Sequence, residues 1–139
     1  MNERTQIVEV DSILRILPQG PPALLVDRIL EIEPGARIVT VKNLTVCEPA
    51  FAGHFPGLPL LPGTVLVEAL VQSCCILAWA TEQFDPGTKV PTLLGINKFK
   101  FRRSLRPGEK VEMECKMERQ RSNVWRFSVA AFVEDHHVA

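Results

Sequence analysis

The sequence predicts an α+β domain in which a curved antiparallel sheet wraps around one long helix. The helix is expected over residues 64–81, because 13 of the 17 residues from Thr64 to Ala80 are apolar and such a helix must be covered on most sides. Three strand signals follow it, at residues 92–103, 109–120 and 124–134, and short turns join them. Sequential strands with short turns pair antiparallel, so the last part of the chain should form much of that sheet.

The residues before the long helix predict a short helix and a β-hairpin. Asp11 or Ser12 can cap a helix over residues 13–17, which a proline then stops. Residues 23–33 and 37–46 have the composition of strands, and a Pro-Gly turn separates them. These two strands should pair as an antiparallel hairpin.

A long loop should connect the hairpin to the helix. Residues 48–63 contain four prolines and three glycines, so no regular helix or strand can run through them. Because each proline fixes its own φ angle, we expect this loop to be ordered. His54 lies within it.

Length and composition limit what the chain can be. For 139 residues, folding buries roughly 68% of the unfolded surface, which suffices for one domain over residues 1–139 and leaves no room for a second. Sixteen basic residues balance sixteen acidic residues, so no overall field draws the protein to nucleic acid or to a membrane. The sequence has no zinc-ligand spacing and no glycine-rich nucleotide motif, and it predicts neither a metal nor a cofactor.

The sequence also predicts a soluble, cytoplasmic protein. Its N-terminus is polar and carries acidic residues, unlike a signal peptide. The longest apolar segment, residues 65–80, is shorter than a membrane span and contains Glu68 and Gln72. The cysteines form no Cys-x-x-Cys pair, so we expect buried free thiols in a reducing compartment. The cysteines are Cys47, Cys74, Cys75 and Cys115.

The chemically informative residues lie in the loop and in the first half of the long helix. A loop fixed by proline and glycine can hold the imidazole of His54 in place, as a general base requires. Gly63 and Thr64 should open the helix, where backbone N–H groups without intrahelical acceptors can polarise a carbonyl group. Glu68 lies one turn further on, and Gln72, one turn beyond, can hydrogen-bond its carboxyl group. This set suits removal of a proton beside a carbonyl group and loss of a β-leaving group.

Each of these residues also has a plainer interpretation. A single loop histidine is more often structural or incidental than catalytic, and Gln72 could simply satisfy a backbone group. Glu68 is more telling, because a carboxylate is costly to bury without a purpose. We expect burial on the apolar helix to keep Glu68 protonated, so that it can donate a proton. His136 and His137 are expected to be tail residues rather than metal ligands.

Three segments resemble the β-hydroxyacyl-acyl-carrier-protein dehydratases of bacterial fatty acid synthesis. The segment AGHFPGLPLLPGTVLVEALVQ is similar to the signature of that family, which has the hotdog fold. LLVDRILEIEPGARIVTVKNLTVCEPAFAGHFPG and LLGINKFKFRRSLRPGEKVEME resemble its flanking segments. The similarity extends from about residue 14 to residue 133.

The resemblance implies an activity and a role for each site residue. His54 matches the catalytic histidine, Glu68 the catalytic acid, Gly63 the backbone donor to the thioester carbonyl, and Gln72 the residue that positions the acid. The implied reaction converts (3R)-3-hydroxyacyl-acyl-carrier-protein to trans-2-enoyl-acyl-carrier-protein, and glutamate at the acid position is typical of members without isomerase activity. The implied assembly is a homodimer or a trimer of dimers, with the histidine and the acid of one site on different protomers. The implied partner is an acyl carrier protein that bears a phosphopantetheine-linked acyl chain.

The sequence departs from the family pattern at three places. Residues Gln19 to Pro22 stand where the family usually has His-Arg-Tyr-Pro, and Thr64 stands where valine is common. These positions bear on the acyl chain that is accepted, so a specialised dehydratase of polyene or secondary-lipid synthesis stays open. The sequence ends at Ala139, where the family usually continues into a further strand, so either it is shortened or its final strand is short.

Charge is unevenly distributed along the chain. Residues 98–126 contain ten basic and four acidic residues. Lys98, Lys100 and Arg102 should share one face of the predicted strand 92–103, with phenylalanines on the other face. A basic face can be a solvated surface or a dock for an acidic carrier protein. The family resemblance favours docking through Arg102, Arg103 and Arg106.

Two other classes of function compete with a dehydratase. A hotdog acyl thioesterase would need an attacking water or a carboxylate nucleophile in place of a histidine base. A non-catalytic acyl-binding subunit would need neither group, and the presence of both His54 and Glu68 argues against it. Formation of an enoyl chromophore, release of a free thiol, or no change would distinguish the three classes.

Overall fold

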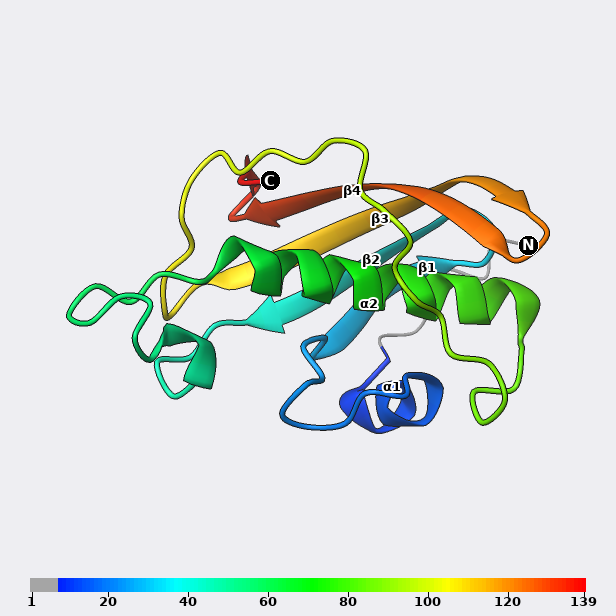
Figure 1. Ribbon diagram of the computed structural model, residues 1–139, viewed down its shortest axis with the longest axis horizontal. Helices are drawn as coiled ribbons and strands as arrows, with labels where there is room; N and C mark the ends of the chain where they lie inside the picture. The colour runs from blue at the N-terminus through cyan, green and yellow to red at the C-terminus, as the bar shows by residue number, and fades with distance from the viewer. Residues whose placement is uncertain (1–7) are drawn as a thin grey trace.

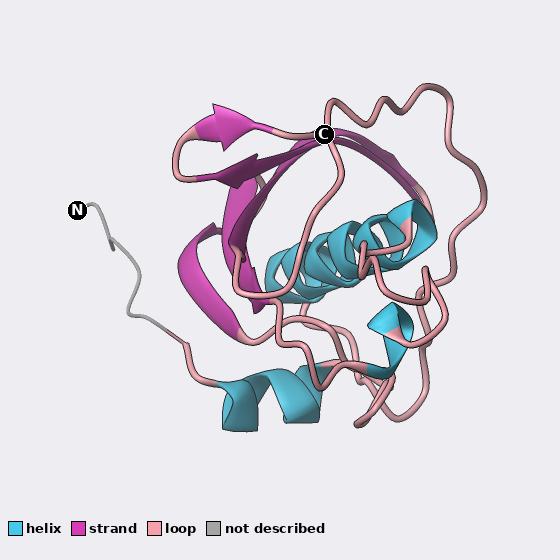
Figure 2. Ribbon diagram, turned by 90° about the vertical axis from the view of Figure 1, so that its left-hand side faces the viewer, coloured by secondary structure: helices cyan, strands magenta, loops and turns pink. Residues whose placement is uncertain are grey.

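The computed structural model describes residues 8–139 as a curved antiparallel sheet around one long helix (Figures 1 and 2). The strands follow one another across the sheet in the order β1-β2-β3-β4-β5, and each pairs antiparallel with the next. The elements are α1 (Val10–Ile16), β1 (Arg28–Glu33), β2 (Arg37–Asn43), the short 3₁₀ helix η1 (Pro49–Phe51), α2 (Gly63–Glu82), β3 (Lys110–Arg121), β4 (Val124–Val133) and β5 (His136–His137). The predicted α+β architecture is confirmed.

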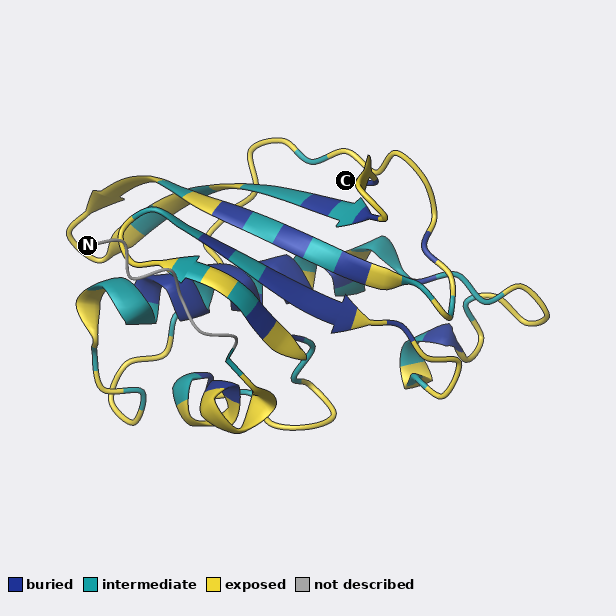
Figure 3. Ribbon diagram, turned by 180° about the vertical axis from the view of Figure 1, so that it is seen from behind, coloured by how far each residue is buried: buried dark blue, intermediate teal, exposed yellow. Residues whose placement is uncertain are grey.

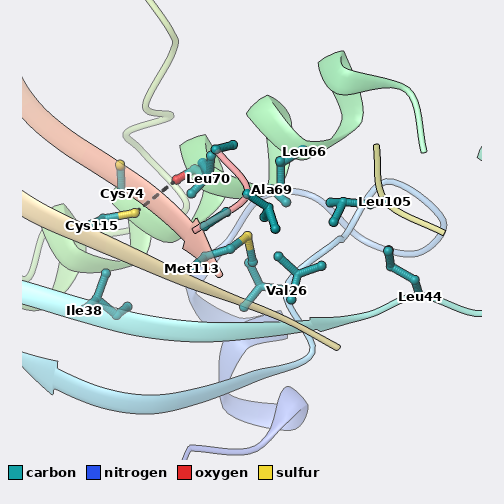
Figure 4. Packing of buried hydrophobic residues seen from close by; sticks show 14 of the residues in the cluster. Val26, Ile38, Leu44, Leu66, Ala69, Leu70, Cys74, Leu105, Met113 and Cys115 are labelled. Atoms are coloured by element: carbon teal, nitrogen blue, oxygen red, sulfur yellow. Dashed lines mark hydrogen bonds between the residues drawn. The ribbon is translucent and has the colours of Figure 1, made fainter. Parts of the chain in front are cut away.

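Helix α2 forms the centre of the core. One of its faces packs on the concave side of the sheet, and its buried side chains include Leu66, Leu70 and Leu77. Met113 and Ile38 project toward it from β3 and β2 (Figure 4). The helix is long and apolar enough to cross a membrane by length and composition, but it lies inside the curve of the sheet, so its apolarity reflects its place in the core.

Alternation along the strands explains how the sheet covers the helix. In β3, buried residues alternate with less buried ones from Lys110 to Lys116 (Figure 3). In β2, Ile38, Thr40 and Lys42 face inward, and the hydroxyl groups of Thr40 and Ser73 of α2 lie 2.7 Å apart in a hydrogen bond. These inward positions fix which residues of the hairpin can reach the helix.

The predicted hairpin forms, with shorter strands than expected. Strand β1 begins at Arg28 and not at residue 23, because residues 23–25 give their backbone groups to a side chain of α2 instead of a neighbouring strand. Strand β2 ends at Asn43. The backbone of Leu44, the next residue, forms hydrogen bonds with Gly108 and Glu109 in the turn before β3. The Pro-Gly turn is present, and its Gly35 has a φ of 79°, which favours glycine.

The predicted strand at residues 92–103 is wrong. These residues form an extended arc without regular structure between α2 and β3 (Figure 1). Within residues 8–139, β5 occupies part of the outer edge of β4 and no strand pairs with residues 92–103, although the N–H of Arg102 donates to the carbonyl of Val138, directly after β5, over 2.8 Å. The expected division into a basic and an aromatic face holds only in part, because Phe99 is half-buried against the core whereas Phe101 is 52% exposed.

The two helix starts also differ from the expectations. Helix α1 starts at Val10 with Glu9 as its N-cap, and no side chain caps it, so capping by Asp11 or Ser12 is wrong. Helix α2 spans nearly the predicted residues and starts at Gly63. Residues 44–62 form the expected irregular loop, apart from the single turn of η1.

The cysteines are free, and they differ in burial. Cys74 and Cys115 are buried where α2 packs on β3, and Cys75 is half-buried. Cys47 is exposed, which corrects the expectation that all four thiols are buried. Its position in the loop after β2 gives it no apolar element to pack against.

Candidate active site

His54 is held by the backbone of its own loop. Its Nδ1 lies 2.9 Å from the carbonyl oxygen of Leu60, and its backbone N–H donates to the carbonyl of Phe51 over 3.2 Å. The N–H of Leu60 donates in turn to the His54 carbonyl over 2.9 Å. The imidazole is half-buried and stacks on Phe55 with ring centroids 4.2 Å apart.

The contact with Leu60 fixes which ring nitrogen can act as a base. A carbonyl oxygen can only accept a hydrogen bond, so Nδ1 of His54 must carry the proton. In the neutral imidazole, the proton-free nitrogen is then Nε2. The loop therefore presents the lone pair of Nε2 to whatever binds beside it.

Gly63 at the start of α2 lies against an aromatic ring. A Cβ atom at this position would lie 2.6 Å from the ring of Phe101, so a side chain here would have to displace that ring. Pro62 precedes it as the N-cap in an extended conformation. The backbone N–H of Gly63 belongs to the first turn, where helical N–H groups have no intrahelical acceptor. The absence of a side chain leaves that N–H approachable.

Glu68 lies on the second turn of α2 and is exposed, so its expected burial is wrong. Thr64, Glu68 and Gln72, each four residues apart on α2, form a polar stripe that turns from solvent to core along the helix: Thr64 and Glu68 are exposed, and Gln72 is fully buried. The stripe faces away from the sheet at its N-terminal end, and no described residue covers it there. Protonation of Glu68 therefore cannot rest on burial within one chain.

Gln72 is the structural partner of Glu68. Its Oε1 accepts from the N–H of Leu25 over 2.9 Å, and its Nε2 donates to the carbonyl of Ala23 over 2.9 Å and to Oε1 of Glu68 over 3.0 Å. Because the Leu25 N–H needs an acceptor, the amide cannot flip, and its nitrogen must face the carboxylate. The contact that the spacing of Glu68 and Gln72 predicts is present.

The histidine and the acid are not joined within the chain. No hydrogen bond or ion pair connects His54 to Glu68 in the part of the chain that the structure describes. His54 lies in the loop beyond the N-terminal end of α2, and Glu68 lies on an open face of that helix. Within one chain, each group has its own partner, the Leu60 carbonyl for His54 and the Gln72 amide for Glu68.

The three arginines of the predicted docking surface are exposed but differ in their contacts. Arg103 forms an ion pair with Glu109 over 2.8 Å, and this hydrogen-bonded partner raises the pKa of Arg103. Burial on its own raises the pKa of Glu109, but hydrogen bonds from Arg103 and from the N–H of Arg106 outweigh it, and the pKa lies below its ordinary value. The side chains of Arg102 and Arg106 form no ion pair among the described residues.

Two further features border the site. A cleft of about 1350 Å³ lies between the arc after α2, the outer edge of β4 and the helix itself; Cys74, Phe99 and Trp125 are among its lining residues. In the loop between α1 and β1, Oε1 of Gln19 is buried without a hydrogen-bond partner among the described residues. Residues 8–139 contain no group of three potential metal ligands.

One contact near the site was missed from the sequence. Lys42 at the end of β2 forms an ion pair with Glu48 at the start of the His54 loop. The signal was present, because the alternation that turns Ile38 and Thr40 inward turns Lys42 inward as well. An inward lysine needs a buried partner, and Glu48 is the next acidic residue along the chain.

Comparison with known proteins identifies the family. Residues 17–139 match the FabA-like domain. The chain belongs to this family. Among its curated relatives are proteins named 3-hydroxyacyl-[acyl-carrier-protein] dehydratase FabZ. The protein from Myxococcus xanthus is 40% identical over 132 residues, covering 95% of this chain and 86% of the relative. That from Herpetosiphon aurantiacus is 41% identical over 133 residues, covering 96% and 93%.

A solved structure supports the same fold. A chain of the dehydratase heterocomplex ApeI:P from Xenorhabdus doucetiae superposes with a TM-score of 0.73 and covers 91% of this chain and 84% of its own. The two are 14% identical in sequence, so the likeness concerns the arrangement of the sheet and the central helix. The hotdog fold expected from the sequence is confirmed.

Proposed function

We propose that this protein dehydrates (3R)-3-hydroxyacyl-acyl-carrier-protein to trans-2-enoyl-acyl-carrier-protein, with His54 as the base and Glu68 as the acid. Its curated relatives carry the name of this activity at about 40% identity over most of the chain. The observation that carries the assignment of residues is the hydrogen bond from His54 Nδ1 to the Leu60 carbonyl, because it leaves Nε2 free to accept a proton.

The proposed reaction uses each group once. Nε2 of His54 removes a proton from C2 of the acyl chain, and the electrons of that C–H bond form the C2–C3 double bond. The C3–O bond breaks as the carboxyl group of Glu68 gives its proton to the departing hydroxyl group, which leaves as water. The N–H of Gly63 donates to the thioester carbonyl oxygen, where negative charge develops. Gln72 holds the carboxyl group of Glu68 in place.

We infer that each active site combines two chains of a homodimer. No described hydrogen bond or ion pair joins His54 to Glu68 within one chain, and Glu68 is exposed on α2. Large apolar side chains are exposed near His54 and on the arc after α2, and an apolar surface of this kind favours association. These side chains are Phe55, Leu58, Val90, Leu93, Leu94, Ile96 and Phe101. A second chain that also covers the exposed part of α2 around Glu68 would enclose the carboxyl group.

The substrate is proposed to arrive on an acyl carrier protein. Arg102 and Arg106 are exposed and without ion-pair partners among the described residues, so they are available to an acidic protein surface. Arg103 could contribute only part of its charge, because Glu109 already neutralises it locally. We further propose that residues 1–139 act as one domain and that the enzyme works in the cytoplasm.

The decisive experiment incubates the purified protein with a 3-hydroxyacyl thioester. A gain of enoyl absorbance with no free thiol supports the dehydratase. Release of free thiol would instead identify a thioesterase, and the proposal would be wrong. The assay should be run over a series of acyl chain lengths, because the Gln19–Pro22 segment is the part of the acyl site that departs from the family pattern.

A further inference from the structure

A buried ion pair stands at the start of the loop that carries His54. The side chain of Lys42 is 3% exposed and that of Glu48 is 19% exposed, and the ammonium group contacts Oε1 of the carboxylate. The second oxygen, Oε2, is buried and has no hydrogen-bond partner among the described residues. Lys42 is therefore the group that compensates this buried carboxylate.

Stability does not account for such a pair. Removing two charges from water costs several kcal/mol per ion, and apolar side chains of similar size often serve as well or better. Lys42 occupies the inward position after Ile38 and Thr40, where an apolar residue would fit the pattern of the strand. The pair thus needs an explanation in what it holds in place.

Two backbone hydrogen bonds link Glu48 to His54. The N–H of Phe51 donates to the carbonyl of Glu48 over 3.1 Å, and the N–H of His54 donates to the carbonyl of Phe51 over 3.2 Å. Pro49 fixes the first φ angle between them, and the side chain of Phe51 is buried. The position of Glu48 therefore determines where the turn of η1 begins and where the imidazole lies.

The other side of His54 is held by a different element. Leu60 makes backbone and ring contacts with His54, and Leu61 next to it donates its N–H to the carbonyl of Leu105 over 2.8 Å. This attachment ties the far end of the loop to the segment before β3. The ion pair connects the near end of the loop to β2. The loop that carries the imidazole is therefore attached at both of its ends.

We propose that the Lys42–Glu48 ion pair is a positioning element for His54, which sets the distance of the imidazole from the bound acyl chain and keeps its proton on Nδ1. This inference rests on the proposed role of His54 as the base. Neither Lys42 nor Glu48 touches the substrate in this arrangement. A shift of the base by about 1 Å costs on the order of 10²-fold in rate, which is the effect that loss of the pair should have.

The kinetic test compares K42M, K42R and a control variant. Lys42→Met removes the charge and keeps the length of the stem, and it should lower kcat on the order of 10²-fold with KM close to the wild-type value. Lys42→Arg restores the charge and should recover most of kcat. Glu114→Gln is the control. It removes the ion pair between Glu114 of β3 and Arg37, which lies on β2 like Lys42, and it should leave kcat unchanged. A folded K42M with wild-type kcat would overturn the proposal.

Folding is controlled with a second variant. A lone buried carboxylate can unfold K42M, since removing one partner of a buried ion pair is strongly destabilising. The double variant K42M/E48Q leaves no buried charge unpaired. Its kcat tests the proposal in the same way as that of K42M. A folded double variant with low kcat supports positioning. A folded double variant with wild-type kcat shows that the pair only compensates its own charges.

A spectroscopic measurement separates this inference from the proposed function. The ring ¹⁵N shifts of His54 report its tautomer without any turnover. The wild-type protein should show the Nδ1–H form, and K42M or the double variant should show a mixture of tautomers. Unchanged shifts would overturn the inference even if the protein is a dehydratase. A wild-type protein without dehydratase activity would instead refute the proposed function and leave this measurement valid.

Discussion

The side-chain amide of Gln72 donates to the carboxylate of Glu68 over 3.0 Å while both of its other hydrogen-bonding positions are occupied by the backbone of residues 23–25. The acid is thereby connected to the loop before β1, although it lies on an exposed face of α2. This contact orients the carboxylate of Glu68, because the amide of Gln72 has only one orientation that satisfies all its partners.

Replacing Gln72 should damage both stability and turnover. In Gln72→Leu, the carbonyl of Ala23 and the N–H of Leu25 lose their partner, and each of these partly buried hydrogen bonds contributes about 1 kcal/mol. Chemical denaturation should show this loss in the free energy of unfolding. Among the molecules that remain folded, kcat should fall because Glu68 is no longer oriented. If kcat per folded molecule stays at the wild-type value, Gln72 is a structural residue only.

Replacing His54 should abolish dehydration and spare the fold. In His54→Ala, loss of the general base should lower turnover on the order of 10²-fold or more. The side chain is only half-buried, so the thermal unfolding midpoint should change little. His136→Ala, at an exposed position of β5, is the matched control and should retain full activity. Near-normal turnover in purified His54→Ala would remove this residue from the mechanism.

Two inactive variants should partly rescue each other. If the site is shared, a mixed dimer of His54→Ala and Glu68→Gln has one site with both changes and one with neither. Unfolding and refolding an equal mixture should give about half mixed dimers and roughly a quarter of wild-type activity. Each variant refolded alone provides the baseline. A mixture that stays at this baseline would place both groups on one chain.

The arginine surface should matter for carrier-bound substrate only. Changing Arg102, Arg103 and Arg106 together to alanine should raise KM for acyl-carrier-protein substrate far more than for a short thioester, since exposed interfacial charges mainly affect encounter. Added salt should reduce the difference. Arg15→Ala, on the exposed side of α1, serves as the control. Equal effects on both substrates would leave the surface as an ordinary solvated face.

Acid should weaken the link between β2 and β3. A hydrogen bond from Arg37 holds the pKa of Glu114 below its ordinary value of 4.5. Because the folded pKa is the lower one, the stabilisation is complete above pH 4.5 and is lost as the pH falls through the folded value. Both side chains are partly exposed, so the effect is about 1 kcal/mol or less.

Denaturant unfolding above and below this pH checks the sign. Glu114→Gln should be less stable than the wild type above pH 4.5, and the difference should shrink at lower pH. A difference that grows on acidification would contradict the assignment of the shift to Arg37.

The sequence predicts elements well where the signal is local. The apolar run of α2 and the alternation of residues 109–120 depend on each segment's own periodicity, and both elements form. Residues 92–103 carry an equally good pattern and form no strand, because a strand needs a neighbour to receive its hydrogen bonds. The early start predicted for β1 fails for a related reason, since Gln72 takes the backbone groups of residues 23–25.

The candidate site was predictable in its residues and less so in its environment. Spacing along a helix places Gln72 beside Glu68 without further information. Burial is a property of the whole assembly, and the apolar character of α2 did not reveal that Glu68 faces away from the sheet. The contact of His54 with the Leu60 carbonyl, which selects the tautomer, was not predicted either. Every residue has a backbone carbonyl, so the residue type does not indicate which one accepts this hydrogen bond.

The uneven burial of the thiols makes the native chain convenient for fluorescence labelling. Burial and the neighbouring Cys74 raise the pKa of Cys75 to about 12, so a maleimide dye meets almost no thiolate there at neutral pH. Cys74 and Cys115 are buried. Cys47 alone among the four is exposed, and it directly precedes Glu48. A dye on this native residue would report movements of the loop in real time without any engineered cysteine.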